Sequence, residues 1–327
     1  MKVVIITPVF NDWESFTVLL HRIDQIALSN PIFDNVEVSI MAIDDGSTLS
    51  YKKHSSEWGG LQKINLLEIL SLNRNVGHQK AITIALASIS REPLYDAVVI
   101  MDSDGEDQPE DISKLLARHL ESGERIVFAQ RKKRSEGVVF VLLYKIYKLV
   151  YRVLTGFSIS FGNFCLIPQK LLKRLVNVSE IWNHFSGGVI RSKLPITTIE
   201  TNRGTRFCGI SKMNLTTLII HGLSAISVQI DIVAVRFLLI SIILILFSII
   251  SILVVVGVKF LTAYATPGWA STVVFGFTMI VMQAFFVSLF LVFIILTYRT
   301  QKLFIPYYDY EKYVDFKVTI AAKESRD

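Results

Sequence analysis

The stretch Val98-Val99-Ile100-Met101-Asp102-Ser103-Asp104-Gly105-Glu106-Asp107 decides the fold of this chain. Its four leading apolar residues are typical of a strand buried on both faces of a sheet, and the polar run that follows marks the strand's carboxyl end. Ligands of open α/β sheets bind beside the carboxyl ends of strands. Asp102 and Asp104 therefore lie where a bound group is expected.

Strands and helices alternate on both sides of this stretch, through residues 1 to about 130. The predicted strands cover residues 2–7, 36–43, 63–70, 97–101 and 126–129. The predicted helices cover residues 13–28, 77–90 and 109–120. Pro109 suits the first turn of its helix. This alternation predicts an α/β domain with a mainly parallel sheet and helices on both faces.

Apolar residues make up 51% of the chain and are concentrated near its C-terminus. Two long apolar spans, at 237–258 and 272–296, are separated by a turn that contains Pro267 and Gly268. At 1.5 Å per residue the first span is about 33 Å long, which is enough to cross a hydrocarbon core. We therefore predict a transmembrane hairpin.

Basic residues flank this hairpin at both outer ends, where Arg236 precedes it and Arg299 follows it, whereas the turn carries Lys259 alone. The positive-inside rule then places both termini in the cytoplasm. The predicted location is the inner (plasma) membrane, with the N-terminal domain in the cytoplasm. In that reducing compartment Cys165 and Cys208 are expected to be free thiols.

The formal net charge of +6 comes from one segment. Residues 131–152 contain seven basic side chains and one acid, so the rest of the chain sums to zero. Lys145, Lys148 and Arg152 form one stripe of a helix predicted at 138–154. Their apolar and aromatic neighbours favour an anionic membrane surface over nucleic acid, which is not expected as a partner. An interfacial helix is the favoured interpretation, and a core helix with solvated lysines is the alternative.

Asp102 and Asp104 can share a divalent cation. Mg²⁺ and Mn²⁺ prefer oxygen ligands and keep waters and substrate phosphate in their shell. The alternative is a turn whose acids cap the next helix, which would suit Asp107 and Asp111.

Three further polar segments follow strands or open a helix. Residues 43–47, Ile-Asp-Asp-Gly-Ser, offer carboxylates to a base edge or a ribose hydroxyl, although an ordinary Asp-Gly turn explains them equally. Residues 7–12, Thr-Pro-Val-Phe-Asn-Asp, can frame a nucleoside. Residues 73–81 open a helix whose N-terminal amides favour anions. Six histidines show no metal-ligand spacing, and His78 and His184 are the two to follow.

These four segments, in this order, resemble the family 2 glycosyltransferases of the Rossmann-like GT-A fold. The closer resemblance is to the dolichyl-phosphate mannose synthase-like branch. Its members are polyprenyl-phosphate glycosyltransferases with two C-terminal transmembrane helices. The family patterns P-V-Y-N-E, D-D-G-S, R-N-x-G-x-x-x-A and D-A-D-L-Q-D-P-P-E match residues 8–12, 44–47, 74–81 and 102–110. A late R-Y-A-G-x-S-K-Y pattern matches residues 206–213, so the resemblance covers nearly the whole chain.

The resemblance implies a nucleotide-diphosphate sugar and a Mg²⁺ or Mn²⁺ ion held by Asp102 and Asp104. The implied contacts to the nucleotide sugar are Pro8, Val9, Asn11, Asp44, Asp45, Arg74, Gly77, Lys80, Asp102, Ser103 and Asp104. The implied contacts to an acceptor phosphate are Arg131, Arg206 and Lys212. The residues implied in catalysis are Asp102, Asp104, Asn163 and Arg206.

One departure from the family concerns the acceptor. Many relatives carry D-T-G-D-F-R-L where this chain has Ser160-Phe161-Gly162-Asn163-Phe164-Cys165-Leu166, so both acids are replaced. A hydroxyl acceptor needs a general base, whereas a phosphate monoester, with a second pKa of about 6, is already nucleophilic near neutrality. Asn163 can still orient the acceptor. The Q-x-x-R-W motif of processive synthases is also missing, which favours transfer of a single sugar.

We therefore predict inverting transfer of one sugar to a polyprenyl phosphate, with undecaprenyl phosphate expected in a bacterium. The alternatives are transfer to a lipid or glycan hydroxyl, and a non-catalytic membrane scaffold. Expected partners are the nucleotide sugar, the polyprenyl phosphate, membrane lipids and further copies of the chain in a homo-oligomer. The predicted parts are a GT-A domain at 1–212, an amphipathic helix at 213–231, the hairpin at 232–298 and a cytoplasmic tail at 299–327.

Overall fold

The computed structural model describes residues 1–92, 94–132, 138–209, 215–261, 268–300 and 304–322. The chain forms two compact units. The first, which we call the sheet unit, comprises residues 1–148, 158–228 and 303–327. The second, the hairpin unit, comprises residues 149–157 and 229–302.

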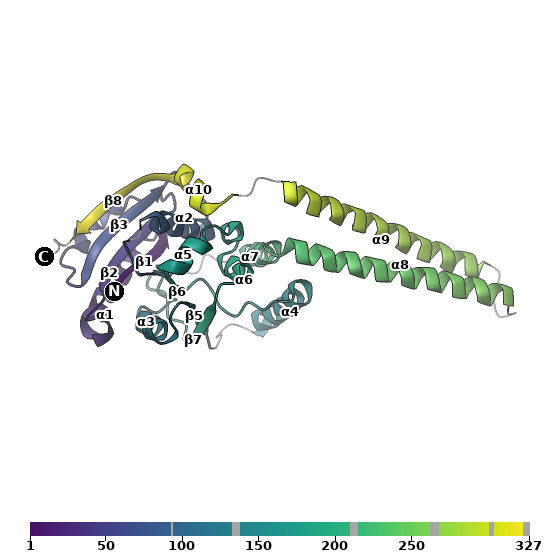
Figure 1. Cartoon of the computed structure of the whole chain (residues 1–327), viewed down its shortest axis with the longest axis horizontal. Coiled ribbons are helices and arrows are strands. Elements are labelled where there is room, and N and C mark those ends of the chain that lie inside the picture. The colour runs from purple at the N-terminus through teal and green to yellow at the C-terminus, as the bar shows by residue number, and fades with distance from the viewer. Residues whose placement is uncertain (93, 133–137, 210–214, 262–267, 301–303, 323–327) are drawn as a thin grey trace. The chain divides into compact units, whose positions relative to one another are not determined.

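The sheet unit is built on one eight-stranded sheet (Figure 1). Its strands are β1 (Lys2–Val9), β2 (Glu37–Asp44), β3 (Ile64–Leu72), β4 (Ala97–Ile100), β5 (Ile126–Arg131), β6 (Cys165–Pro168), β7 (Ile196–Thr201) and β8 (Val314–Ala322). They lie in the order β7-β5-β6-β4-β1-β2-β3-β8. Neighbouring strands among β1 to β4 are parallel, whereas β6 and β8 run antiparallel to their neighbours. The predicted Rossmann-like GT-A fold is confirmed.

Helices cover both faces of this sheet. Side chains alternate along β1. Val3 and Ile5 join a core with residues 13–29 and 111–122, whereas Val4 and Ile6 join a core with residues 78–91, 169–175 and 185–192. The helices of the sheet unit and its borders are α1 (Trp13–Ser29), α2 (His78–Arg91), α3 (Asp111–Ser122), α4 (Val138–Thr155), α5 (Gln169–Leu175), α6 (Phe185–Ser192), α7 (Leu215–Ser227) and α10 (Pro306–Asp309). Cys165 and Cys208 are free, as predicted.

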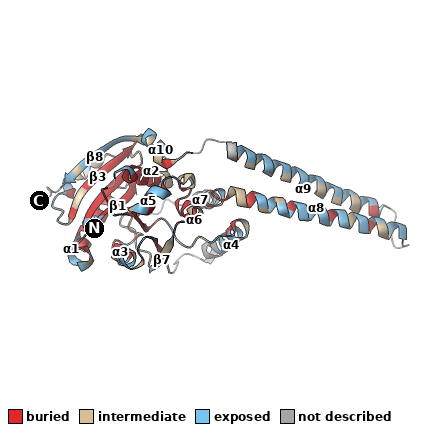
Figure 2. Cartoon of the chain, viewed as in Figure 1, coloured by how far each residue is buried: buried red, intermediate tan, exposed pale blue. Residues whose placement is uncertain are grey.

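The hairpin unit contains two long helices, α8 (Ile230–Leu261) and α9 (Trp269–Thr300), which pack against each other. Buried positions on α8 recur every seven residues, at Ala234, Ser241, Ser248 and Val255. Most other side chains on both helices are apolar and exposed (Figure 2). Both helices are long and apolar enough to cross a membrane. Two long apolar helices therefore lie where the spans are predicted, and each extends beyond the predicted limits; that they cross a membrane stays a prediction.

The C-terminal segment differs from the predicted tail. Residues 303–327 belong to the sheet unit, where β8 pairs with β3 and places Leu70 opposite Lys317. The Lys317 ammonium lies 3.2 Å from a Glu68 oxygen and 2.9 Å from a Glu92 oxygen. This pairing joins segments about 240 residues apart, so no local sequence pattern points to it.

The end of the predicted GT-A domain also differs. The sheet unit continues past residue 212 to include α7. The predicted amphipathic stretch at 213–231 is divided, because α7 ends at Ser227 and α8 begins at Ile230. The interfacial position of this stretch and of the 138–154 helix stays a prediction.

Candidate active site

Parallel pairing brings the predicted segments to one edge of the sheet. Val9 of β1 is paired with Asp44 of β2, and Asp44 is paired with Ser71 of β3. On the other side, Ile6 is paired with Ile100 of β4. The loops after these four strands therefore meet at their carboxyl ends, where open α/β sheets bind ligands.

The loops after β1 and β2 brace each other. Asn11 has a φ of 53°, and its side-chain oxygen accepts hydrogen bonds from the N–H groups of Thr48 and Leu49, both at 2.9 Å. Its own N–H donates to the Ser47 hydroxyl at 3.0 Å, and the Ser47 N–H donates to Asp44 at 2.8 Å. The Asn11 side-chain oxygen thus holds this turn, and a contact of Asn11 to the nucleotide sugar stays a prediction.

Asp45 fixes the loop between β3 and α2. Its two carboxylate oxygens accept hydrogen bonds from the N–H groups of Val76 at 2.7 Å and Gly77 at 3.0 Å. Burial raises the pKa of Asp45, although these two bonds oppose the rise. Gly46, with a φ of 68°, lets the loops approach so closely that a Cβ there would lie 2.4 Å from the Asn75 nitrogen.

The end of β1 is tied to both neighbouring loops. The Pro8 carbonyl accepts a hydrogen bond from the Ser103 hydroxyl at 3.3 Å. The Val9 carbonyl accepts one from the Asp45 N–H at 2.9 Å. Pro8, Val9 and Ser103, all predicted contacts to the nucleotide sugar, therefore lie together at this edge.

Other predicted contacts are placed less directly. Arg74 is exposed in the loop before α2. Lys80 lies on the first turn of α2 with its ammonium 5.2 Å from the centroid of the Trp182 ring, a cation–π contact. Lys212 lies outside the described residues.

Asp102 and Asp104 follow β4, and each lies beside one basic side chain. His78 Nε2 is 3.1 Å from Asp102 Oδ1, and Arg206 Nη2 is 3.2 Å from Asp104 Oδ2. The other oxygen of Asp104 accepts a hydrogen bond from the Glu106 N–H at 2.9 Å, which holds the turn. The predicted carboxylate pair thus faces an imidazole and a guanidinium at the strand end.

Residues 202–207 lie directly on this acidic loop. The N–H groups of Gly204 and Phe207 donate to the carbonyls of Glu106 and Asp104, both at 2.8 Å. Gly105 has a φ of 87°, and a Cβ there would lie 2.8 Å from the Phe207 ring. Only glycine permits this approach, which brings the late family stretch against the aspartate pair.

Two more arginines pair with the same loop. Arg203 donates to both oxygens of Glu106, at 2.7 and 3.1 Å. Arg131 donates to Asp107 at 3.0 Å, and Asp107 also accepts a hydrogen bond from the Asp102 N–H at 3.2 Å. Arg131, a predicted contact to an acceptor phosphate, therefore lies at the site but is paired with an acid.

These neighbours shift one another's pKa values. Burial, reinforced by the charge of Asp102, raises the pKa of Asp107 to about 7 and raises the pKa of Asp104 above its ordinary value. Burial also opposes ionisation of Asp102, but His78 outweighs it and lowers the pKa of that carboxyl. Conversely, Asp102 outweighs desolvation and raises the pKa of His78.

Asn163 reaches the same imidazole. Its side-chain nitrogen is placed 3.1 Å from His78 Nε2, the ring nitrogen that also faces Asp102. One nitrogen cannot donate to Asp102 and accept from an amide N–H, so a protonated His78 requires the Asn163 oxygen to face it. Asn163 therefore lies at the site, as the resemblance implies.

The sequence pattern singles out His78 without giving it a role, and it gives no site role to Arg203 or Glu106. His78 is the first residue of α2, directly after Gly77. The start of α2 lies near the end of β4 because of the sheet topology, which a local sequence pattern does not contain. A signal for Arg203 does exist in the sequence. Two arginines three residues apart, Arg203 and Arg206, complement a run of four acids between residues 102 and 107.

The donor set fits a divalent cation that is only partly ligated by protein. Asp102 and Asp104 offer carboxylate oxygens, which suit Mg²⁺ and Mn²⁺. Among the described residues, no three His, Cys, Asp or Glu side chains are grouped to hold a metal. Two carboxylates leave most coordination positions for water and substrate phosphate, as is usual for Mg²⁺.

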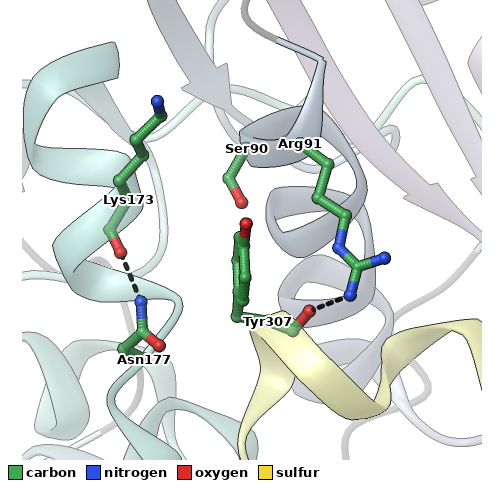
Figure 3. A pocket seen from close by; sticks show the side chains of 5 residues that line it. All are labelled: Ser90, Arg91, Lys173, Asn177 and Tyr307. Atoms are coloured by element: carbon green, nitrogen blue, oxygen red, sulfur yellow. Dashed lines mark hydrogen bonds between the residues drawn. The ribbon is translucent and has the colours of Figure 1, made fainter.

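A separate hollow lies at the other end of α2. It has a volume of about 490 Å³ and is lined by Ser90, Arg91, Lys173, Asn177 and Tyr307 (Figure 3). Arg91 donates to the Tyr307 carbonyl at 2.9 Å, and Asn177 donates to the Lys173 carbonyl at 2.7 Å. Since α2 separates His78 from Arg91 by about 20 Å along its axis, this hollow is distinct from the candidate active site.

Comparison with known protein families identifies the family of this chain. The sequence matches the glycosyl transferase family 2 model over residues 4–185, which is more than half of the chain. The chain belongs to glycosyl transferase family 2. The matched region contains the four strand-end loops and Asn163, whereas Arg203 and Arg206 lie beyond it.

Two curated relatives of this family 2 chain are each named undecaprenyl-phosphate 4-deoxy-4-formamido-L-arabinose transferase. The protein from Klebsiella pneumoniae subsp. pneumoniae is 27% identical over 137 residues. The protein from Proteus mirabilis is 29% identical over 136 residues. Each match covers 42% of this chain and 39% of the relative. The chain thus spans about two fifths of the length of these relatives, and its own helices α8 and α9 are long and apolar enough to cross a membrane.

Among solved structures, mannosyl-3-phosphoglycerate synthase from Rubrobacter xylanophilus is similar to this family 2 chain. The TM-score is 0.50 at 17% sequence identity, and the match covers 70% of this chain and 72% of that protein. At this identity the similarity concerns the fold.

Proposed function

We propose that the chain transfers one sugar, with inversion, from a nucleotide-diphosphate sugar to a polyprenyl phosphate such as undecaprenyl phosphate. One observation carries the proposal. In a chain of glycosyl transferase family 2, Asp102 and Asp104 lie at the carboxyl end of β4 with the Arg206 guanidinium 3.2 Å from Asp104. Carboxylates for a metal ion and a guanidinium for a phosphate thus meet at one strand end.

The donor is proposed to lie across the loops after β1, β2 and β4. The corner formed by Asn11, Asp44 and Ser47 is held in shape without a ligand, because each of these side chains accepts a hydrogen bond from a nearby backbone N–H. A divalent ion held by Asp102 and Asp104 would neutralise charge on the leaving diphosphate. The protein's own part is to position the donor and to exclude alternative orientations.

The acceptor is proposed to be a phosphate rather than a hydroxyl. Asn163 stands where many relatives carry an acid, and it contacts His78 at 3.1 Å. A phosphate monoester with a second pKa of about 6 carries its own nucleophilic oxygen near neutral pH. Asn163 then orients the acceptor, while Arg131 and Arg206 supply positive charge once phosphates compete with the loop acids for them.

A hydroxyl acceptor is the second candidate, because the structure places an imidazole, that of His78, next to Asn163. An imidazole can serve as a general base. However, His78 Nε2 already lies 3.1 Å from Asp102 Oδ1 and 3.1 Å from the Asn163 side chain, so both groups compete with an acceptor hydroxyl for this nitrogen. This balance favours the phosphate acceptor.

We place the reaction at the cytoplasmic face of the membrane, with both termini inside. The support is the asymmetry of basic residues around the hairpin, which carries only Lys259 in its turn. The membrane hairpin would keep the site close to a lipid acceptor whose chain stays in the bilayer.

The test is incubation of the purified full-length protein with a panel of nucleotide sugars and either polyprenyl phosphate or polyprenol, with Mg²⁺ or Mn²⁺. We expect one nucleotide sugar to be consumed with polyprenyl phosphate and none with polyprenol. Equal turnover of both acceptors would refute the phosphate acceptor. No product with any donor would favour the non-catalytic scaffold.

A further inference from the structure

One polar side chain in the middle of α9 has no hydrogen-bond partner among the described residues of the hairpin unit. Gln283 is exposed, and its carboxamide makes no hydrogen bond to any of the described residues. The other polar groups along the centre of this helix behave differently. The hydroxyls of Thr278 and Ser288 each donate to a carbonyl one turn earlier, at 2.8 Å, and are thereby satisfied within the helix.

Gln283 lies deep in the apolar span. The span at 272–296 places it about 17 and 20 Å from the two ends, at 1.5 Å per residue. A hydrocarbon core is about 30 Å thick, so the headgroups are about 15 Å away on either side. A glutamine side chain is too short to reach them, and an unpaired amide in hydrocarbon is costly.

Gln283 lies on a helix stripe that the hairpin does not cover. Residues seven positions apart share a helix face, and Gly276 and Phe290 lie seven positions on either side of Gln283. Both are exposed, and a Cβ added to Gly276 would meet no atom within 4 Å. The face that packs on α8 is a different one, marked by the buried Ala270 and Ala284.

A second copy of the chain is the occupant that fits this stripe. Two copies with the same membrane topology hold α9 parallel and Gln283 at the same depth, so a two-fold axis along the membrane normal brings the two carboxamides together. Each amide N–H can then donate to the partner's oxygen, which satisfies both groups at once. Gly276 would allow the two backbones to approach closely on the same stripe.

We propose that the chain self-associates in the membrane through the α9 stripe of Gly276, Gln283 and Phe290, with paired Gln283 carboxamides at its centre. This inference does not depend on the proposed sugar transfer. None of these residues belongs to the candidate active site, so substitutions on the stripe leave the catalytic groups in place.

The first test measures association in a bilayer. Full-length protein labelled at the N-terminus with donor or acceptor fluorophores is reconstituted in phosphatidylcholine–phosphatidylglycerol vesicles at decreasing protein-to-lipid ratios. Gln283→Leu should raise the ratio needed for half-maximal energy transfer about tenfold, since two interhelical hydrogen bonds are lost. The matched control Thr278→Val removes a hydroxyl that bonds only within its own helix, and should leave that ratio unchanged.

The second test locates the contact. In a Cys165→Ala, Cys208→Ser background, Val287→Cys lies on the Gln283 stripe and should form an intermolecular disulfide on oxidation. Leu289→Cys, which is also exposed but faces another side of α9, should not. Equal energy transfer for wild type and Gln283→Leu, a monomer at every ratio, or equal crosslinking at both positions would each overturn the proposal.

Discussion

The sheet unit should lose stability as the pH falls below neutral because of His184. This histidine is 5% exposed and precedes α6, where its Nδ1 accepts a hydrogen bond from the Gly187 N–H at 3.0 Å. Its ring lies 4.6 Å from the ring of His221. Burial, followed by the charge of His221, lowers the pKa of His184 from 6.5 to about 3. A protonated ring would lose this bond and be left charged in the interior.

The sign and size follow from proton linkage. Because the folded pKa is depressed, the unfolded chain binds the proton more readily between pH 6.5 and 3, so the stabilisation is present above pH 6.5 and is lost as the pH falls. Between pH 7 and pH 5 this one group should remove about 2 kcal/mol from the free energy of unfolding. For a unit of this size that corresponds to a fall in Tm of about 4–8 °C.

His184→Asn is the variant that isolates this effect. Asparagine can still accept the Gly187 hydrogen bond as an N-cap, but it does not titrate. The variant's absolute Tm will shift because the side chain is smaller, so the quantity to compare is the change in Tm between pH 7 and pH 5. Between pH 7 and pH 5 the Tm of His184→Asn should fall by about 4–8 °C less than the Tm of wild type. In the control His21→Asn, at an exposed histidine on α1, the Tm should fall as much as in wild type. Parallel pH profiles for His184→Asn and wild type would refute the reasoning.

Three further outcomes are expected. Asp104→Asn should reduce sugar transfer about 100-fold or more while the protein stays folded, because an amide oxygen can still accept the Glu106 bond; wild-type activity of this variant in chelator would show the cation site to be wrongly assigned. Asn163→Ala should cost less activity than Asp104→Asn in the same assay, since Asn163 orients the acceptor and takes no proton; a larger loss would reopen the question of a base. Ser271→Cys should react with a membrane-impermeant thiol reagent in intact cells, because the turn between α8 and α9 should face away from the cytoplasm; labelling only after permeabilisation would reverse the topology.

The part of the fold that local sequence predicts is the part built from consecutive β/α units. The strands that end at Val9, Asp44 and Ile100 are largely apolar runs followed by polar loops, and such runs identify buried parallel strands without knowledge of their partners. Since parallel strands place their carboxyl ends at one edge, the candidate site at Asp102 and Asp104 follows from the strand assignment.

The rest of the site depends on distant pairings that a local pattern does not contain. β6 enters the sheet antiparallel between β4 and β5, and it thereby carries the preceding Asn163 toward His78. Arg203 and Arg206 reach the acid loop through backbone hydrogen bonds from residues 204 and 207 across about 100 positions of sequence. Charge complementarity suggests such a contact, but only the fold shows which acid each arginine meets.

The pairing of β8 with β3 constrains the topology more strongly than charge does. The chain leaves the sheet unit before α8 and returns to it after α9, because β8 is hydrogen-bonded to β3 in the same sheet. If α8 and α9 each cross the bilayer, the number of crossings between residues 228 and 314 is even, so both ends of the hairpin lie on the same side of the membrane. The distribution of basic residues then has to decide only which side that is. The connection between the two spans carries Lys259 as its one basic residue, and the positive-inside rule therefore favours a cytoplasmic sheet unit.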